Sequence, residues 1–76
     1  MSKLPVISGK KLCKVLEQIG YSVDHQTGGH IILRNENPPH RRLTIPNHKV
    51  IAKGTLRAII RQAGLTLEEF QKLLEK

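Results

Sequence analysis

Four histidines, at positions 25, 30, 40 and 48, are the side chains of this sequence best suited to proton transfer. Imidazole gains and loses a proton near neutral pH, so it can serve as a base or as an acid. No two of these histidines share the close spacing of a compact metal motif, and Cys13 is the only cysteine. We therefore expect no metal, no other cofactor and no disulfide within the chain.

His30 stands apart because it directly follows Gly28 and Gly29. A turn without side chains lets a large ligand approach the next residue closely. RNA carries its own nucleophile, the 2′-hydroxyl beside each phosphate, so a cleaving protein needs a base for that proton and cations for the phosphate. His30 is our candidate for this base. The alternative is that His30 has no chemical role and is simply the polar first residue of a strand.

Positive charge is the second prominent feature, with thirteen Lys and Arg against six Asp and Glu and a net charge of +7. Residues 34–62 hold a single acid, Glu36, whereas other acids gather near the end of the chain. This uneven distribution predicts a basic surface that binds a polyanion, although a solvated basic face would give the same pattern. The predicted RNA contacts are Lys10, Lys11, Arg34, Arg41, Arg42, Lys53 and Arg57.

The length of 76 residues is enough for one domain, residues 1–76, with a modest core and no deep active site. The N-terminal residues include no long apolar run, so we expect neither a signal peptide nor a membrane span. A single thiol fits a reducing compartment. A cytoplasmic location is the resulting expectation.

A helix should precede the candidate base. Ser8 is a plausible N-cap, and Gly20 is a plausible stop signal. Between them, apolar residues recur at helical spacing and form one stripe. The stripe consists of Leu12, Val15, Leu16 and Ile19.

Three strands should follow, because apolar and polar residues alternate after Gly20. In the first strand, Tyr21, Val23 and His25 are expected on one face. A turn at residues 27–29 leads to a second strand over residues 30–35, and a third runs over residues 41–45 before Pro46.

Two further helices complete the pattern. The first is expected over residues 55–63, before Gly64. The second should begin after Thr66, which forms a capping-box pattern with Glu69.

The predicted fold class is therefore α+β, in the order helix, three antiparallel strands, helix, helix. The helices should cover one face of the sheet by packing on its apolar residues, Ile31, Leu33, Leu43 and Ile45. The opposite face would then present His30, Arg34, Arg42 and Thr44. This parity depends on the register, which a bulge near Gly28 and Gly29 would shift.

Several stretches together resemble the HicA-type toxins, also called YcfA-like proteins, over nearly the whole chain. The similarity lies in their joint order and spacing. The stretches are Leu4-Pro5, Ser8-Gly9-Lys10, Leu16-Glu17, Gly20-Tyr21, Gly28-Gly29-His30, Arg42-Leu43-Thr44-Ile45-Pro46, His48, Lys53-Gly54-Thr55-Leu56, Ile59-Ile60 and Gln62-Ala63-Gly64.

The resemblance implies a fold like the double-stranded RNA-binding domain and a type II toxin that cleaves mRNA without a metal. It implies a HicB-type antitoxin as the inhibitory partner. The family's catalytic histidine maps onto His30. The residue before it is usually serine, whereas this chain has Gly29. The resemblance identifies no second acid–base residue, which leaves His25 and His48 as candidates for protonating the leaving 5′-oxygen.

Two other functions remain open at this point. A non-catalytic double-stranded RNA-binding module would share the fold and the basic surface. A protein-interaction unit could instead use its cationic face against an acidic partner.

Overall fold

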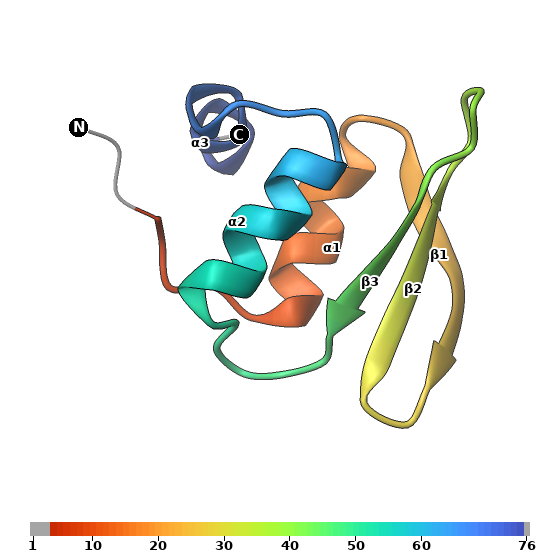
Figure 1. The fold of residues 1–76 in the computed structure, drawn as a ribbon, viewed down its shortest axis with the longest axis horizontal. Coiled ribbons are helices and arrows are strands. Elements are labelled where there is room, and N and C mark those ends of the chain that lie inside the picture. The colour runs from red at the N-terminus through yellow and green to blue at the C-terminus, as the bar shows by residue number, and fades with distance from the viewer. Residues whose placement is uncertain (1–3, 76) are drawn as a thin grey trace.

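The computed structural model describes residues 4–75, so part of the N-terminal stretch behind the expectation of no signal peptide lies outside the described residues. Within these residues, no helix is long and apolar enough to cross a membrane. The predicted element order is confirmed, and Figure 1 shows the three helices gathered on one side of the sheet. The elements are α1 (Gly9–Glu17), β1 (Tyr21–Thr27), β2 (His30–Asn35), β3 (Arg42–Pro46), α2 (Lys53–Gln62) and α3 (Leu67–Leu74).

Helix α1 begins as its sequence predicts. The Ser8 hydroxyl accepts a hydrogen bond from the Lys11 amide at 3.1 Å, which satisfies one of the free N–H groups of the first turn. The helix is followed by Gly20, whose φ of 97° suits a residue without a side chain. Its apolar stripe, including Leu12 and Leu16, is buried against the sheet.

The sheet is antiparallel with strand order β1-β2-β3, so β2 is central. In the β2–β3 ladder Ile31 lies opposite Ile45, and Leu33 opposite Leu43. All four side chains are buried. Paired residues in such a ladder share a face, so these pairs define the side that the helices cover.

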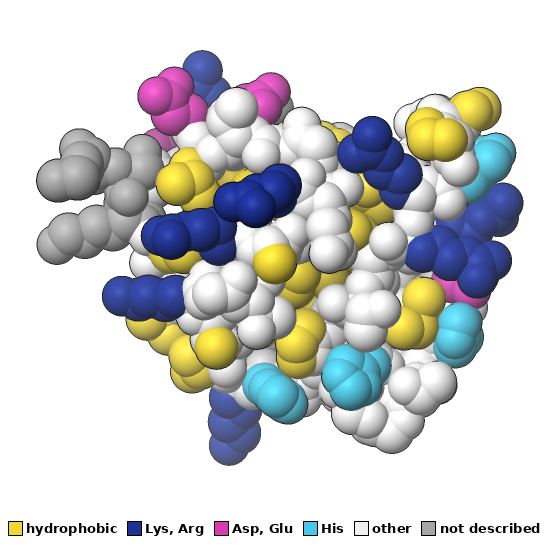
Figure 2. Space-filling model, in the orientation of Figure 1, with side chains coloured by type: hydrophobic (Ala, Val, Ile, Leu, Met, Phe, Trp, Pro, Cys, Tyr) yellow, Lys and Arg dark blue, Asp and Glu magenta, His cyan; other side chains and the backbone are white. Residues whose placement is uncertain are grey.

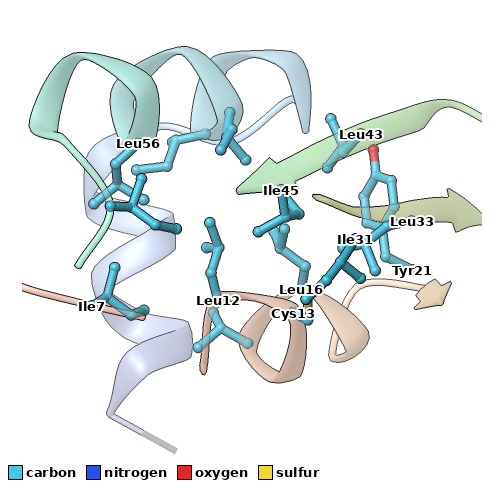
Figure 3. Packing of buried hydrophobic residues seen from close by; sticks show 14 of the residues in the cluster. Ile7, Leu12, Cys13, Leu16, Tyr21, Ile31, Leu33, Leu43, Ile45 and Leu56 are labelled. Carbon is cyan, nitrogen blue, oxygen red and sulfur yellow. The ribbon is translucent and has the colours of Figure 1, made fainter. Parts of the chain in front are cut away.

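The core lies between this face and the helices. Figure 3 shows side chains from α1, α2 and the sheet meeting there. Leu12, Leu16 and Ile45 belong to one cluster of buried residues. Phe70 of α3 is fully buried in the same cluster. Helix α3 carries the predicted capping box, in which the Thr66 hydroxyl and the Glu69 carboxylate each accept the other residue's backbone N–H.

Helix α2 and strand β3 have boundaries that differ from the sequence prediction. Helix α2 runs over Lys53–Gln62 rather than residues 55–63. Its N-cap, Ala52, makes no side-chain hydrogen bond, so no capping residue marks this start in the sequence. Strand β3 starts at Arg42 rather than Arg41 and includes Pro46. Proline is tolerated there because β3 is an edge strand.

The register of β1 corrects one prediction. The ladder shifts between Val23 and His25, which leaves Asp24 as the extra residue of a bulge. His25 therefore pairs with Ile32 and lies on the face opposite Val23, whereas strict alternation had placed the two together. The turn at Gly28 and Gly29, where a bulge was considered, is regular, with Thr27 paired to His30.

Candidate functional site

His30 is the first residue of the central strand, directly after the turn that joins β1 to β2. It is exposed, and it pairs with Thr27 on one side and Pro46 on the other. A β-carbon built on Gly28 or Gly29 would meet no atom within 4 Å. The space before His30 is thus open, while its backbone is held by both neighbouring strands.

The surface around His30 is the side of the sheet that no helix covers, which we call the open face. Alternation along the strands and the paired registers assign its members. They are Ser22, His25 and Thr27 of β1, His30, Ile32 and Arg34 of β2, and Arg42, Thr44 and Pro46 of β3. The structure thereby brings His30, Arg34 and Arg42 onto one face, as the sequence predicted.

Two arginines lie directly opposite each other on the open face. Arg34 pairs with Arg42 in the β2–β3 ladder, and both side chains are exposed. Like charges in directly opposed positions destabilise a sheet. A bound anion would offset this repulsion, so the pair fits a surface that receives phosphate groups.

Asp24, the extra residue of the bulge, is the acid beside these cations. Nδ1 of His25 lies 2.8 Å from Oδ2 of Asp24. The hydrogen bond from His25, followed by the positive charges of His25, Arg42 and Arg34, holds the pKa of the Asp24 carboxyl below its usual value. Asp24 is therefore an ionised carboxylate at neutral pH.

Sequence analysis missed Asp24. Adjacent residues of a regular strand point to opposite faces, so Asp24 and His25 gave no signal as a pair. Only the bulge brings their side chains together.

The remaining predicted contacts are divided between two other regions. Lys10, in the first turn of α1, lines an open hollow of about 210 Å³ together with Ser8, Asn47, His48 and Lys49. Backbone hydrogen bonds tie this region to the turn before His30, since Asn47 donates to Gly29 and Gly9 donates to His48, both at 2.9 Å. Lys11 is exposed in the same first turn.

Arg41, Lys53 and Arg57 are not brought to the open face. Nη1 of Arg41 donates to the Gln62 carbonyl at 3.3 Å, at the end of α2. Lys53 and Arg57 are exposed on α2, on the helical side of the molecule. Figure 2 shows this division, with one group of Lys and Arg over α2 and another at the right edge, beyond the sheet.

Cys13 is poorly suited to nucleophilic chemistry. Burial, with a smaller contribution from the charge of Glu17, raises the pKa of its thiol to about 11. The thiol therefore stays protonated at neutral pH, and the thiolate is the reactive form. Within residues 4–75, no three His, Cys, Asp or Glu side chains are grouped so that they could hold a metal ion.

Comparison with known proteins gives a family match. No curated protein matches the chain. A family described as the HicA toxin of bacterial toxin–antitoxin systems matches residues 9–65, from the first residue of α1 to the segment beyond α2. Since this match covers most of the 76 residues and includes every strand, the chain belongs to the HicA toxin family.

Proposed function

We propose that this toxin is an endoribonuclease that cleaves mRNA and thereby stops translation, with His30 as the general base. Family membership supports the toxin function. The observation that carries the proposal is the position of His30. It is exposed at the start of the central strand, after two residues without side chains, on the same face as Arg34 and Arg42.

The proposed reaction uses His30, Arg34 and Arg42 together with the 2′-hydroxyl of the RNA. His30 removes the proton of a 2′-hydroxyl, and the 2′-oxygen attacks the adjacent phosphorus. The P–O5′ bond breaks, which leaves a 2′,3′-cyclic phosphate and a 5′-hydroxyl. The attack adds negative charge to the phosphoryl oxygens, and the guanidinium groups of Arg34 and Arg42 stabilise it. RNA supplies the nucleophile, so the proposed reaction uses no metal or cofactor.

The proposed partner is a HicB-type antitoxin that covers the open face. A protein surface with carboxylates over Arg34 and Arg42 would neutralise their charge and bury His30 in one step. The expected place of action is the cytoplasm, where mRNA is translated.

A non-catalytic RNA-binding module is the second candidate. The element order and the exposed arginines would support phosphate binding even if His30 took no part in chemistry. The two candidates differ in one property, which is whether RNA is cut.

The experiment compares cellular RNA after induction of the wild type, His30→Ala and His40→Asn at matched protein levels. His40 is a useful control because it is exposed like His30 but lies beyond the other end of β2. Asparagine tolerates its φ of 61°.

We expect the wild type and His40→Asn to degrade mRNA and arrest growth, and His30→Ala to do neither while still binding RNA. Binding without cleavage by all three proteins would favour the RNA-binding module. Cleavage by His30→Ala at the wild-type rate would exclude His30 as the base.

A further inference from the structure

The bulge in β1 places a second histidine near the candidate base. His25 pairs with Ile32, and Ile32 is two residues from His30 on the same face of β2. His25 and His30 are therefore diagonal neighbours across the two strands. Such positions lie about 7–8 Å apart, within reach of long side chains. Without the bulge His25 would lie on the opposite face.

The pair of histidines matches the geometry of phosphodiester cleavage. The attacking and leaving oxygens lie on opposite sides of the phosphorus in an in-line reaction. Each needs a proton-transfer group within about 3 Å. A phosphate placed between two imidazoles on one face can meet both requirements.

Asp24 gives His25 a defined orientation. Its carboxylate is ionised, so it can only accept the hydrogen bond, and Nδ1 of His25 must be the donor. Nε2 is then the nitrogen left to meet a substrate. The His25 side chain is 52% exposed and that of Asp24 36%, so a ligand can reach the ring. Among residues 4–75, His25 is the histidine with a carboxylate partner.

We propose that His25, oriented by Asp24, is the general acid that protonates the leaving 5′-oxygen, opposite His30. This inference rests on the ribonuclease function proposed above. His30 accepts the proton of the 2′-hydroxyl as the O2′–P bond forms. The P–O5′ bond breaks, its electron pair stays on O5′, and that oxygen receives a proton from Nε2 of His25. Asp24 is a positioning residue.

His48 is the competing acid, but its surroundings fit the role less well. Its side chain lines the hollow beside Lys10 and Lys49, in the loop after β3, and it is not a member of the open face. Cations there suit the binding of a neighbouring phosphate rather than the delivery of a proton to the scissile one.

The test uses two forms of one RNA oligonucleotide that contains a single cleavage site. In the first, the scissile bond is an ordinary phosphodiester. In the second, sulfur replaces the bridging 5′-oxygen of that bond. A thiolate leaves without being protonated, because thiols are far stronger acids than alcohols. Loss of a general acid therefore slows cleavage of the first substrate and spares the second.

We expect His25→Ala to lower cleavage of the ordinary bond by about 10²–10⁴-fold. Cleavage of the sulfur-containing bond should fall by less than about tenfold, since that bond needs no acid. His30→Ala should lose both reactions, and His40→Asn should keep both. His25→Gln, which retains a polar side chain, serves as a second variant, and circular dichroism checks that each protein is folded.

Asp24 is tested in the same assay. Asp24→Asn should slow the ordinary substrate by a smaller factor than His25→Ala and spare the sulfur-containing one. Asp24→Glu, which keeps the charge, should recover part of the lost rate. A purely structural role would affect both substrates equally.

Three outcomes would overturn the inference. Folded His25 variants that lose both reactions to the same extent would show a binding role, and variants that lose neither would show no role. Selective loss in His48→Ala instead would assign the acid to His48. If the wild type cleaves neither substrate, the proposed ribonuclease function itself fails, and this result is distinct from a failure of His25 alone.

Discussion

Gly9 lies against the carbonyl group of Pro46, so closely that a β-carbon on residue 9 would overlap the carbonyl oxygen. The Gly9 amide also donates to the His48 carbonyl at 2.9 Å. The first residue of α1 is thus held against residues 46–48, at the end of β3 and in the loop that follows it. Through the hydrogen bond from Asn47 to Gly29, that segment also holds the turn before His30.

Gly9→Ala should therefore destabilise the protein. Because the obstructing atoms belong to the backbone, the start of α1 must shift, and such overpacking costs about 1–3 kcal/mol. Urea denaturation would measure the loss. Gly54→Ala is the matched control, since a β-carbon on this α2 residue meets nothing within 4 Å and alanine favours a helix by about 0.5–1 kcal/mol. Equal stability of Gly9→Ala and the wild type would contradict the contact.

Gly29→Ser should leave stability within about 0.5 kcal/mol of the wild type, because the side chain enters open space on the surface. The resemblance to HicA-type toxins predicts a serine at the position before the candidate base, where this chain has Gly29. A hydroxyl beside His30 can donate a hydrogen bond to a phosphate oxygen, so we expect a several-fold higher rate of RNA cleavage. Parallel measurements of thermal unfolding and of the single-turnover rate would check both parts. An unchanged rate would show that the serine has no role in this chain.

Arg42→Gln should weaken RNA binding and reduce its dependence on salt. If Arg42 neutralises one phosphate, the slope of log Kd against log salt should fall by about 0.7–0.9. Titrations in the His30→Ala background would keep the RNA intact. Lys72→Gln is the control, because Lys72 lies in the last turn of α3, on the helical side of the molecule. Equal slopes for Arg42→Gln and Lys72→Gln would remove Arg42 from the RNA interface.

Ionisation of the Cys13 thiol should make the stability of the protein depend on pH only in alkaline solution. Its folded pKa of about 11 exceeds its ordinary value of 9.0, so the unfolded chain loses the proton first as the pH rises. The resulting stabilisation is complete below pH 9 and is lost between pH 9 and pH 11, by up to about 3 kcal/mol. Urea denaturation of the wild type and Cys13→Ala across this range would isolate the effect. A constant difference between the two proteins would contradict the raised pKa.

Much of the fold could be predicted because its signals are local. The stripe of α1, the capping box of α3 and the alternation of Ile31 and Leu33 each depend on neighbours within a few residues. The start of α2 was predicted two residues too late, because Ala52 makes no side-chain cap. The bulge at Asp24 could not be predicted, since no glycine or proline marks it and it appears only when β1 is aligned against β2.

The candidate site was predictable to a similar extent. His30 was expected beside Arg34 and Arg42 on the uncovered face, and alternation alone is enough for that placement. Arg41 precedes the first paired residue of β3 and turns to the end of α2, a contact 21 residues away in sequence. Asp24 and His25 required the bulge, so their pairing was beyond any pattern based on strict alternation.

The complete burial of Phe70 in α3 affects when the core of this toxin can form during its synthesis. No residue of the open face lies beyond Pro46, whereas the helices that cover the other face of the sheet extend to Leu74. During synthesis on the ribosome, His30 and its cationic neighbours therefore emerge before the chain can close its core. A nascent toxin would carry its candidate reactive groups on an unsupported sheet. Its activity should therefore begin only after α3 has been translated and Phe70 has packed into the core.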